Sequence, residues 1–305
     1  MSKAKPFVKW VGGKSQLIEQ LEASLPANFE AWKDVTYIEP FVGGGAVLFN
    51  LLQVHPNIKK AVINDINPDL INCYQCVKAA PYELIQLLDR IQKEYFSLSE
   101  DGRKQYFLEK RFRYNTKSLN PVENSALFIF LNRTCFNGLY RVNKSGLYTV
   151  PFGRYANPKI CDEETILRDS ELLQNVTILC GDFEQTFGEA TGKTLFYFDP
   201  PYKPLSKTSS FNSYAKEDFD DAEQIRLCEF CKKINTMGYD FILSNADLKG
   251  KNPDDNFFDM LYEEFTIKRV YATRMVNANA DKRGKLTELM ISNFHTNERY
   301  VSFQV

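Results

Sequence analysis

Histidine is scarce in this sequence, which has only two among 305 residues. A Ser-His-Asp triad needs a histidine base, and most catalytic zinc sites use two or three histidine ligands. The scarcity argues against both kinds of active site. We therefore expect a reaction that uses neither a histidine base nor a bound metal ion.

The sequence also lacks a long apolar run. It contains no stretch of about 18 uncharged apolar residues, the length that a membrane-spanning helix requires. The N-terminal residues include lysine and tryptophan but no apolar core of the kind found in a signal peptide. We therefore expect a cytoplasmic protein without membrane contact.

The seven cysteines form no disulfide framework that the sequence makes visible. An odd number spread over a long chain indicates reduced thiols. Two pairs, Cys73/Cys76 and Cys228/Cys231, have the C-x-x-C spacing of zinc sites. Both lie in amphipathic helical patterns, where that spacing places two small apolar side chains on one face. We interpret all four as core residues.

Complete nucleotide-binding loops are missing as well. Gly13-Lys14-Ser15 matches the end of a phosphate-binding loop, but the motif needs a further glycine at position 8, which is Val8. The glycine run Gly43–Gly45 departs from G-x-G-x-x-G, which disfavours NAD. The two glycines and the lysine near the start of the chain therefore need another explanation.

Charge is nearly balanced over the whole chain, at −1, but not along it. Between residues 103 and 155, ten basic residues face only two acidic ones, a local charge of 10 − 2 = +8. A solvated helix face would mix the signs more evenly. The excess predicts a surface for a polyanion such as nucleic acid.

Alternating strand and helix patterns occupy both ends of the chain. The segments VTYIEPFVGGGAVLFNLL (35–52) and KAVINDINPDLI (60–71) read as a β-α-β unit. Three more β-rich runs, VTILCGDF, TLFYFDPPY and YDFILSN, follow after residue 175, with a helical pattern over 218–235 between the last two. This alternation predicts a doubly wound α/β fold.

Residues 70–175 interrupt this alternation. Helical periods replace the strands there, and residues 137–153 alternate around a Lys-Ser-Gly turn as a β-hairpin does. We therefore predict one domain formed by 1–69 and 176–305, and a second domain, 70–175, inserted into it. The inserted domain coincides with the basic segment.

Three predicted strands end in polar or glycine-rich sequence, and open α/β sheets bind ligands at that edge. The glycine run can approach a ligand closely, while Asp65 at the end of the next strand can accept both hydroxyls of a ribose. A nucleoside site follows from this pattern. The structural alternative is an ordinary glycine turn between strand and helix.

The segment Asp199-Pro200-Pro201-Tyr202 is more specific. The prolines fix the backbone and remove two donors, which leaves the Asp199 carboxylate and the Pro200 carbonyl as acceptors for an exocyclic amine. Tyr202 offers a ring on which a planar base can stack. A rigid turn at a strand end is the alternative interpretation.

An exocyclic amine is a poor nucleophile because its lone pair is delocalised into the ring. Two acceptors favour a pyramidal nitrogen and stabilise the positive charge that develops as it attacks an electrophilic carbon. A methylsulfonium donor supplies such a carbon. In-line positioning can contribute about 7 to 11 kcal/mol, without a metal or a covalent intermediate.

Six ordered motifs over almost the whole chain resemble Dam-type DNA adenine-N6 methyltransferases. They are FVKWVGGK (7–14), EPFVGGGAV (39–47), NDINPDLI (64–71), LNRTCFNGLYRVNKSGLYTVPFGRY (131–155), GDF (181–183) and DPPY (199–202). The resemblance implies a Rossmann-like S-adenosylmethionine-dependent methyltransferase fold with a mixed, mostly parallel sheet. It also implies an inserted, mainly helical target-recognition domain that carries a β-hairpin.

The resemblance assigns a methyl donor, a product and a set of binding residues. S-adenosylmethionine would be the donor and S-adenosylhomocysteine the product. Asp199, Pro200, Pro201 and Tyr202 would carry catalysis. The implied cofactor-binding residues are Trp10, Gly12, Lys14, Phe41, Gly43, Gly44, Gly45, Asp65, Asp182, Phe183 and Asp199.

Double-stranded DNA is the implied partner, read within a GATC site by a protein that we expect to be a monomer. The implied DNA-binding residues are Lys9, Arg133, Phe136, Asn137, Leu139, Arg141, Asn143, Pro151, Arg154 and Tyr155. Arg141 would bond guanine bidentately, and Lys9 would read the first guanine. Phe136 and Asn137 would insert where the target adenine leaves the stack.

The sequence departs from the family at Phe136, where tyrosine is common, so the contact at the flipped base can differ in detail. We also predict that the Ser- and Lys-rich segment 203–219 is mobile without DNA and closes over the flipped base through Phe211 or Tyr214.

Three alternatives remain open from sequence. Cytosine N4 is also an exocyclic amine, although serine is more common than Asp199 in enzymes that methylate it. The chain could be a DNA-binding module without catalysis. An RNA substrate is the third, although the hairpin favours duplex DNA because the deep groove of A-form RNA is poorly readable.

Overall fold

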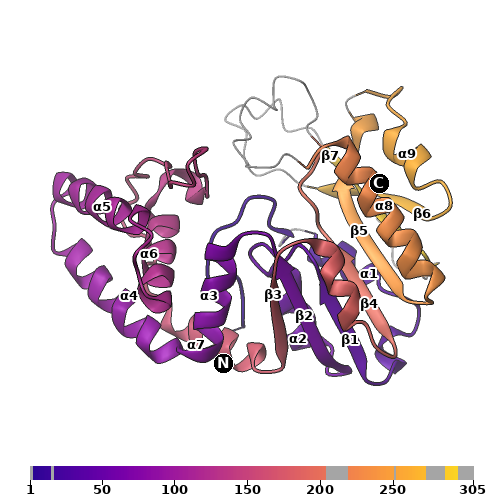
Figure 1. Cartoon of the computed structure of the whole chain (residues 1–305), viewed down its shortest axis with the longest axis horizontal. Coiled ribbons are helices and arrows are strands. Elements are labelled where there is room, and N and C mark those ends of the chain that lie inside the picture. Colours follow the sequence, from indigo (N-terminus) through magenta and orange to yellow (C-terminus); the bar gives the residue numbers. More distant parts are fainter. Residues whose placement is uncertain (1–2, 15–16, 204–218, 251, 273–285, 295–305) are drawn as a thin grey trace, which may run out of the picture.

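The computed structural model describes residues 3–14, 17–203, 219–250, 252–272 and 286–294. Its centre is a seven-stranded sheet (Figure 1) with the order β3-β2-β1-β4-β5-β7-β6. The strands are β1 (Val35–Glu39), β2 (Ile58–Asp65), β3 (Val176–Cys180), β4 (Thr194–Phe198), β5 (Asp240–Ala246), β6 (Thr266–Ala272) and β7 (Leu286–Ser292).

Five strands run parallel and two do not. β1 pairs in parallel with β2 and β4, while β2 pairs with β3 and β4 with β5 in the same sense. β7 is antiparallel to β5, and β6 is antiparallel to β7. The predicted mixed, mostly parallel sheet is confirmed, and the carboxyl ends of its five parallel strands share one edge.

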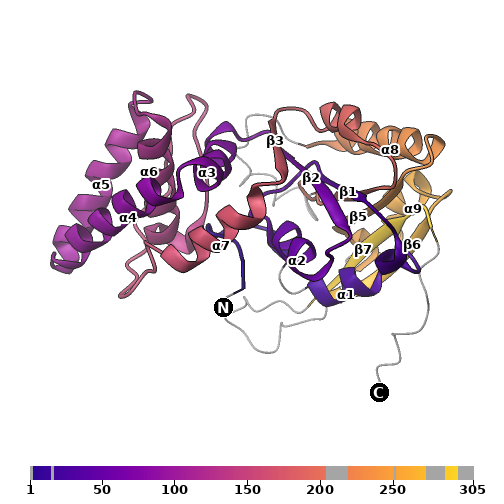
Figure 2. The same ribbon diagram turned by 90° about the horizontal axis from the view of Figure 1, so that it is seen from below.

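Helices cover both faces of the sheet, as Figure 2 shows, with α1 and α2 on one side and α8 on the other. The helices are α1 (Ile18–Ala23), α2 (Ala46–Val54), α3 (Pro68–Ala79), α4 (Pro81–Phe96), α5 (Glu100–Asn115), α6 (Pro121–Thr134), α7 (Glu163–Leu173), α8 (Asp221–Thr236) and α9 (Phe257–Leu261). No helix in the described ranges is both long and apolar enough to cross a membrane.

β1 and β4 are buried on both faces, so their successive residues enter two different cores. Tyr37 packs with α2 and the inserted helices, while its neighbour Ile38 packs with α8 and α9. β4 repeats this division between Tyr197 and Phe198. The C-x-x-C cysteines are buried in these cores, on α3 and α8, as the sequence predicts.

The stretch from α4 to α6 forms a helical lobe at the end of the molecule away from α8 and α9, visible in Figures 1 and 2. Proline and asparagine set its helix starts. α6 begins at Pro121, and Asn120 caps it by accepting a hydrogen bond from the backbone N–H of Glu123. α3 begins in the same way at Pro68, behind the cap Asn67.

The predicted hairpin is an antiparallel loop with isolated bridges in place of regular strands. Val142 bridges Tyr148, and the Asn143 N–H donates to the Leu147 carbonyl at 2.9 Å. Gly146 has a φ of +73° in the turn between them. Asn115, the last residue of α5, bonds both backbone groups of Tyr148 and attaches the loop to the helical lobe.

Residues 3–9 form an extended strap held by side chains. The Gln53 amide bonds both the N–H and the carbonyl of Ala4, at 2.8 and 3.1 Å. Further along, Asp169 accepts from the Lys5 N–H and Arg133 donates to the Phe7 carbonyl. Because these side chains come from α2, α7 and α6, the strap connects the sheet to the helical lobe.

Candidate active site

The sheet edge gathers the predicted site residues because β1, β2 and β4 are neighbours that end together (Figure 1). Glu39 is the last residue of β1 and Asp65 the last of β2, while Asp199 directly follows β4. The glycine turn begins four residues beyond Glu39. The sequence prediction of one shared edge is confirmed.

The turn at Gly43–Gly45 is held from several sides. The Gly43 N–H donates to Asp65 Oδ2 at 3.0 Å, and Tyr74 Oη donates to the Gly43 carbonyl at 3.0 Å. The φ of Gly43 is +48°, and a Cβ there would lie 2.7 Å from Cδ1 of Trp10. Glycine is therefore required both for the turn and for the approach of the indole.

Asp65 retains the capacity to bind a pair of hydroxyls. Its Oδ2 accepts from Gly43 and its Oδ1 from the Asn67 N–H at 2.9 Å, one backbone donor for each oxygen. Each carboxylate oxygen has two acceptor positions, so against the described part of the chain one position remains on each. Burial raises the pKa of Asp65, and the backbone donors oppose that shift. The arrangement fits a ribose.

Asp199 lies at the centre of the polar cluster. Its Oδ1 accepts from Lys14 Nζ at 2.8 Å and from Ser244 Oγ at 3.3 Å. Desolvation raises the pKa of Asp199 to about 6, while Lys14 lowers it. The carboxylate is thus an acceptor at neutral pH, poised near its titration.

Lys14 is buried among oxygen acceptors and a ring. Its ammonium bonds the Gly12 carbonyl at 3.1 Å, lies 4.3 Å from the centre of the Tyr202 ring and 4.0 Å from Glu288 Oε2. The ammonium offsets part of the negative charge of two carboxylates. The opening motif of the chain is therefore brought together with the D-P-P-Y segment, about 185 residues later.

Glu288 is a site residue that sequence reasoning missed. Its Oε2 accepts a hydrogen bond of 2.6 Å from Tyr202 Oη, which raises the pKa of that hydroxyl together with burial. Since β7 runs antiparallel, its first residues lie at the edge where the parallel strands end. The sequence signal for Glu288 was a single acidic residue in a largely apolar strand. It could be assigned to the site only when the antiparallel direction of β7 was known.

Buried amides, also missed, fix the loops around the site. The Gln224 side chain donates to the Pro201 carbonyl at 3.1 Å and accepts from Asn245 at 3.1 Å. Asn64 Nδ2 donates to the carbonyls of Pro40 and Gly181, at 3.0 and 2.9 Å. These amides bond to loops that follow three different strands, β1, β3 and β4.

The predicted adenine-binding pair, Asp182 and Phe183, lies farther along the same edge. Phe183 packs at 5.3 Å from Phe41, measured between ring centres. The Asp182 carboxylate is paired with Arg226 of α8, which holds its pKa below the usual value. Arg226 also lies over the Phe183 ring, at 4.2 Å. The Phe41 and Phe183 rings therefore pack together. The role of Asp182 and Phe183 toward adenine stays a prediction.

Most of the predicted DNA-binding residues lie on the recognition loop, residues 136–155. The exposed ones include Phe136, with 52% of its surface accessible, and also Asn137, Arg141, Asn143, Pro151 and Arg154. Leu139 and Tyr155 are half-buried, and exposed Lys9 lies beside the loop on the strap. Their contacts with DNA remain predictions.

Unlike the exposed residues of the recognition loop, Arg133 directs its side chain to the strap. Its guanidinium donates to the Phe7 carbonyl at 2.8 Å, and burial lowers its pKa. This contact serves the strap. Several other basic residues of 103–155 are also engaged within the chain: Arg103 bonds three backbone carbonyls, Arg111 bonds the Val150 carbonyl and Lys117 pairs with Asp69. The local charge count therefore overstates the charge available to a polyanion.

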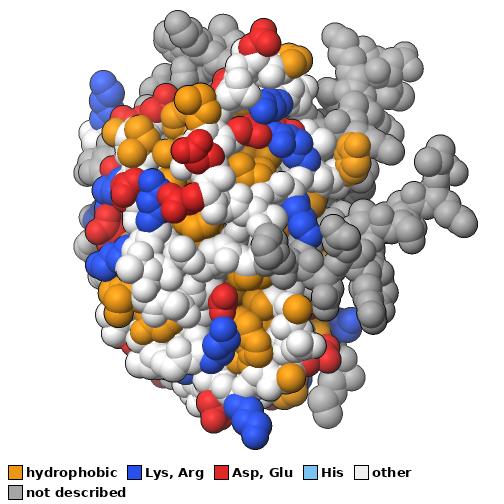
Figure 3. All heavy atoms as spheres, turned by 90° about the vertical axis from the view of Figure 1, so that its right-hand side faces the viewer, with side chains coloured by type: hydrophobic (Ala, Val, Ile, Leu, Met, Phe, Trp, Pro, Cys, Tyr) orange, Lys and Arg blue, Asp and Glu red, His pale blue; other side chains and the backbone are white. Residues whose placement is uncertain are grey.

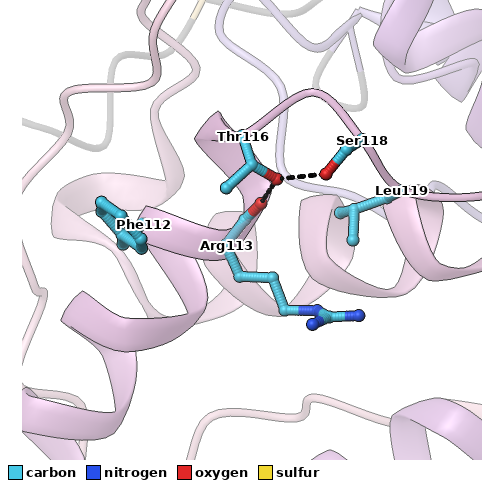
Figure 4. A pocket seen from close by; sticks show the side chains of 5 residues that line it. All are labelled: Phe112, Arg113, Thr116, Ser118 and Leu119. Atoms are coloured by element: carbon cyan, nitrogen blue, oxygen red, sulfur yellow. Dashed lines mark hydrogen bonds between the residues drawn. The ribbon is translucent and has the colours of Figure 1, made fainter.

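A pocket of about 290 Å³ opens on α5 and the turn after it (Figure 4). Its polar groups bond to one another, since Thr116 Oγ1 donates to the Arg113 carbonyl at 2.7 Å and lies 2.9 Å from Ser118 Oγ. None of the predicted site residues lines it. Segment 204–218, with Phe211 and Tyr214, lies outside the described residues, so its predicted closure stays a prediction.

At one sheet edge, the glycine turn and the Asp65 carboxylate lie beside the Asp199-Pro200-Pro201-Tyr202 segment, an arrangement suited to group transfer that depends on a nucleoside. Residues 10–276 match the family model of the D12 class N6 adenine-specific DNA methyltransferases. The chain belongs to this family and is an adenine-specific DNA methyltransferase.

The chain aligns with relatives over nearly its full length. The chain is 50% identical to a Type II methyltransferase, M.MjaIII, of Methanocaldococcus jannaschii, over 95% of this chain and 99% of that one. It is 39% identical to the Type II methyltransferase M1.LlaDCHI of Lactococcus lactis subsp. cremoris, over 95% of each. It is 34% identical to a DNA adenine methylase of Vibrio cholerae, over 95% and 96%.

Proposed function

We propose that this enzyme transfers the methyl group of S-adenosylmethionine to N6 of an adenine flipped out of duplex DNA, within the sequence GATC. The observation that carries the proposal is the contact of Asp199, Tyr202 and Glu288 with the buried Lys14, beside the glycine turn. In the proposed function, this contact would supply an amine acceptor and a stacking ring next to a nucleoside site.

The cofactor would lie across the glycine turn. The free acceptor positions of Asp65 fit its ribose, and the Phe41–Phe183 pair fits a planar base. When bound, it supplies a methyl group on a positively charged sulfur. The negative side chains near Lys14 favour a cation at this edge.

The chemistry of the chain's own residues centres on Asp199. Its carboxylate and the Pro200 carbonyl would accept the two amine protons of adenine, which localises the nitrogen lone pair for attack. The Tyr202 ring, held by Glu288, would stack on the base. As the amine becomes positively charged, Asp199 is positioned to take its proton, since a group near pKa 6 is an effective base at neutral pH.

Residues 70–175 would form the target-recognition domain, and 1–69 with 176–305 the catalytic domain. Arg141 would read guanine in the major groove and Lys9 the first guanine, with Leu139 and Pro151 against thymine. Phe136 and Asn137 would fill the space of the flipped base, while Arg154 and Tyr155 hold phosphates. Relatives named DNA adenine methylases support adenine as the target, and GATC rests on the resemblance of residues 131–155 to the family motif.

The opposite end of the molecule is less suited to DNA. Figure 3 shows that face, where Lys and Arg are interspersed with Asp and Glu. On α8, Arg226 is paired with Asp182, Glu184 and Glu223. A monomer that binds through the recognition loop and strap therefore fits best.

Methyl transfer from radiolabelled S-adenosylmethionine to defined duplexes tests the proposal. The duplexes carry GATC, each single-base variant of it, or GATC already methylated at N6, and Asp199→Ala is the control. We expect label on GATC alone, and none on the premethylated duplex or with the variant. Label on a different sequence would contradict GATC, and label on cytosine would contradict N6.

A further inference from the structure

Asn132, a buried residue of α6, joins the strap to the recognition loop. Its Oδ1 accepts from the Lys9 N–H at 2.7 Å, and its Nδ2 donates to the Lys9 carbonyl at 2.8 Å and to the Gly138 carbonyl at 2.9 Å. Only 2% of Asn132 is exposed. Both amide hydrogens are used, and the Lys9 backbone is held as it would be in an antiparallel bridge.

Gly138 provides the passage for the Lys9 side chain. A Cβ at Gly138 would lie 2.5 Å from Lys9 Cδ and 2.7 Å from Lys9 Cβ. Beyond this passage, the Lys9 ammonium lies 4.4 Å from the centre of the Tyr155 ring. Tyr155 Oη in turn accepts from the Asn137 N–H at 3.0 Å. These contacts link the strap, through Asn132 and Lys9, to both ends of the recognition loop, at residues 137–138 and at Tyr155.

We propose that Asn132 is a specificity-positioning residue, which sets the register of Lys9 against the recognition turn 136–139 and so determines which base pair Lys9 reads. The inference rests on the proposed function, because it takes Lys9 to be a reader of DNA. Asn132 itself touches no base and acts through Lys9 and Gly138.

The physical reason is the nature of lysine as a reader. Its ammonium is a point charge on a flexible four-carbon stem, without the rigid fork of arginine. Discrimination by such a group depends on where its backbone is fixed. Since Lys9 belongs to the strap and not to the recognition loop, a bond between the two must define that position, and Asn132 supplies it.

Gln53 offers a matched control for Asn132. It also makes three hydrogen bonds and also holds both backbone groups of one strap residue, Ala4, while donating to the Phe49 carbonyl at 2.6 Å. Ala4 carries no functional side chain. Gln53→Leu therefore loosens the strap to a similar extent without releasing a reader.

The experiment profiles methylation of a randomised duplex library by the full-length enzyme. Wild type and Lys9→Ala first identify the base pair that Lys9 governs, whatever the preferred site is. We expect Asn132→Leu to reduce the preference at that base pair about tenfold and to leave the base pair governed by Arg141 unchanged. Gln53→Leu should lower the unfolding midpoint without changing either preference.

A second pair keeps the test valid if Asn132→Leu does not fold. Gly138→Ala displaces Lys9 while all three bonds of Asn132 remain possible, and its φ is +62°. Gly192→Ala introduces comparable strain at φ +58°, where an added Cβ meets none of the described atoms within 4 Å. We expect only Gly138→Ala to relax the base pair read by Lys9.

Distinct results overturn the two proposals. A wild-type preference other than GATC would contradict the proposed site but leave the Asn132 inference standing if the selective loss occurs. The inference is overturned if Lys9→Ala relaxes no base pair. It is equally overturned if Asn132→Leu and Gly138→Ala reduce all preferences together or none.

Discussion

In the proposed function, Asp199 must satisfy two opposing demands on one carboxylate. It has to be buried so that its hydrogen bonds to an amine are strong, yet burial favours the neutral form, which is a poorer acceptor. Lys14, at 2.8 Å, resolves the conflict by stabilising the charge. The result is a pKa of about 6, low enough for an ionised group at neutral pH.

The pH dependence of methyl transfer should report the pKa of Asp199, which desolvation raises and Lys14 lowers. We expect kcat to fall as the pH decreases through about 6, because protonation removes the acceptor. Lys14→Met removes the group that lowers this pKa, so the acidic limb should move upward by about 1 pH unit. Lys60→Met, which breaks the ion pair with Glu189, serves as the control. An unmoved limb in Lys14→Met would contradict this account.

Glu288 should act through the hydroxyl of Tyr202. Glu288→Gln and Glu288→Leu both remove the charge, but only glutamine keeps an acceptor for that hydroxyl. A hydrogen bond of this kind contributes about 1 kcal/mol, so we expect kcat to be roughly fivefold to tenfold lower in the leucine variant than in the glutamine variant. In a Tyr202→Phe background the difference should vanish. Equal rates in the two single variants would show that only charge matters.

At the scale of elements, the site depends on where strands end and on the side chains that connect the loops beyond them. The prolines of D-P-P-Y fix the turn after β4 locally. Gln224 on α8 then holds the Pro201 carbonyl, and Asn245 at the end of β5 holds Gln224. The orientation of the turn is therefore set by two elements that follow it in sequence.

Removing Gln224 should weaken both stability and catalysis. Gln224→Leu leaves the Asn245 amide and the Pro201 carbonyl without this partner, which costs about 1 to 3 kcal/mol of unfolding free energy. Urea unfolding measures this loss, and kcat should fall with it because the turn is released. Gln174→Leu changes an exposed glutamine just after α7 that donates to the Lys78 and Ser170 carbonyls, and it should cost less. An equal cost for both would argue against a special role for Gln224.

On the scale of the whole molecule, the strap connects the sheet to the helical lobe through buried polar groups. One of them, Asp169, accepts from the Lys5 N–H at 3.2 Å, and its pKa is raised to about 8 by burial. The neighbouring Asp162 is paired with Lys159, and its pKa lies below the usual value. The two acids therefore influence stability with opposite signs.

The unfolding free energy should depend on pH through both of these acids. Asp169 binds a proton more tightly in the folded than in the unfolded state, so its contribution is complete at low pH and is lost as the pH rises through about 8. Asp169→Asn should make the unfolding free energy less dependent on pH in this range and raise it at alkaline pH. Asp162→Asn should lower stability above the ordinary aspartate pKa. A steeper alkaline decline in Asp169→Asn would contradict the assignment.

Much of the fold and the main site followed from local sequence. The apolar runs before Asp65 and Asp199 predict buried strands, and the prolines predict the rigid turn after β4, since both depend on near neighbours in the chain. The residues that contact each site side chain did not follow from local sequence. The family resemblance assigned Arg133 to DNA, and that role stays a prediction. In the structure its guanidinium donates to the Phe7 carbonyl of the strap, because a cation near an unpaired carbonyl satisfies it wherever the chain brings them together.

The sequence by itself determined the alternating elements, the glycine turn and the positions of Asp65 and Asp199 at the ends of their strands, because each is encoded within a few adjacent residues. Only the tertiary structure decided that Lys14 neutralises Asp199, that Glu288 holds Tyr202 and that Asn132 holds Lys9. These contacts join residues more than 80 positions apart. They depend on strand direction and helix placement, which local periodicity does not specify.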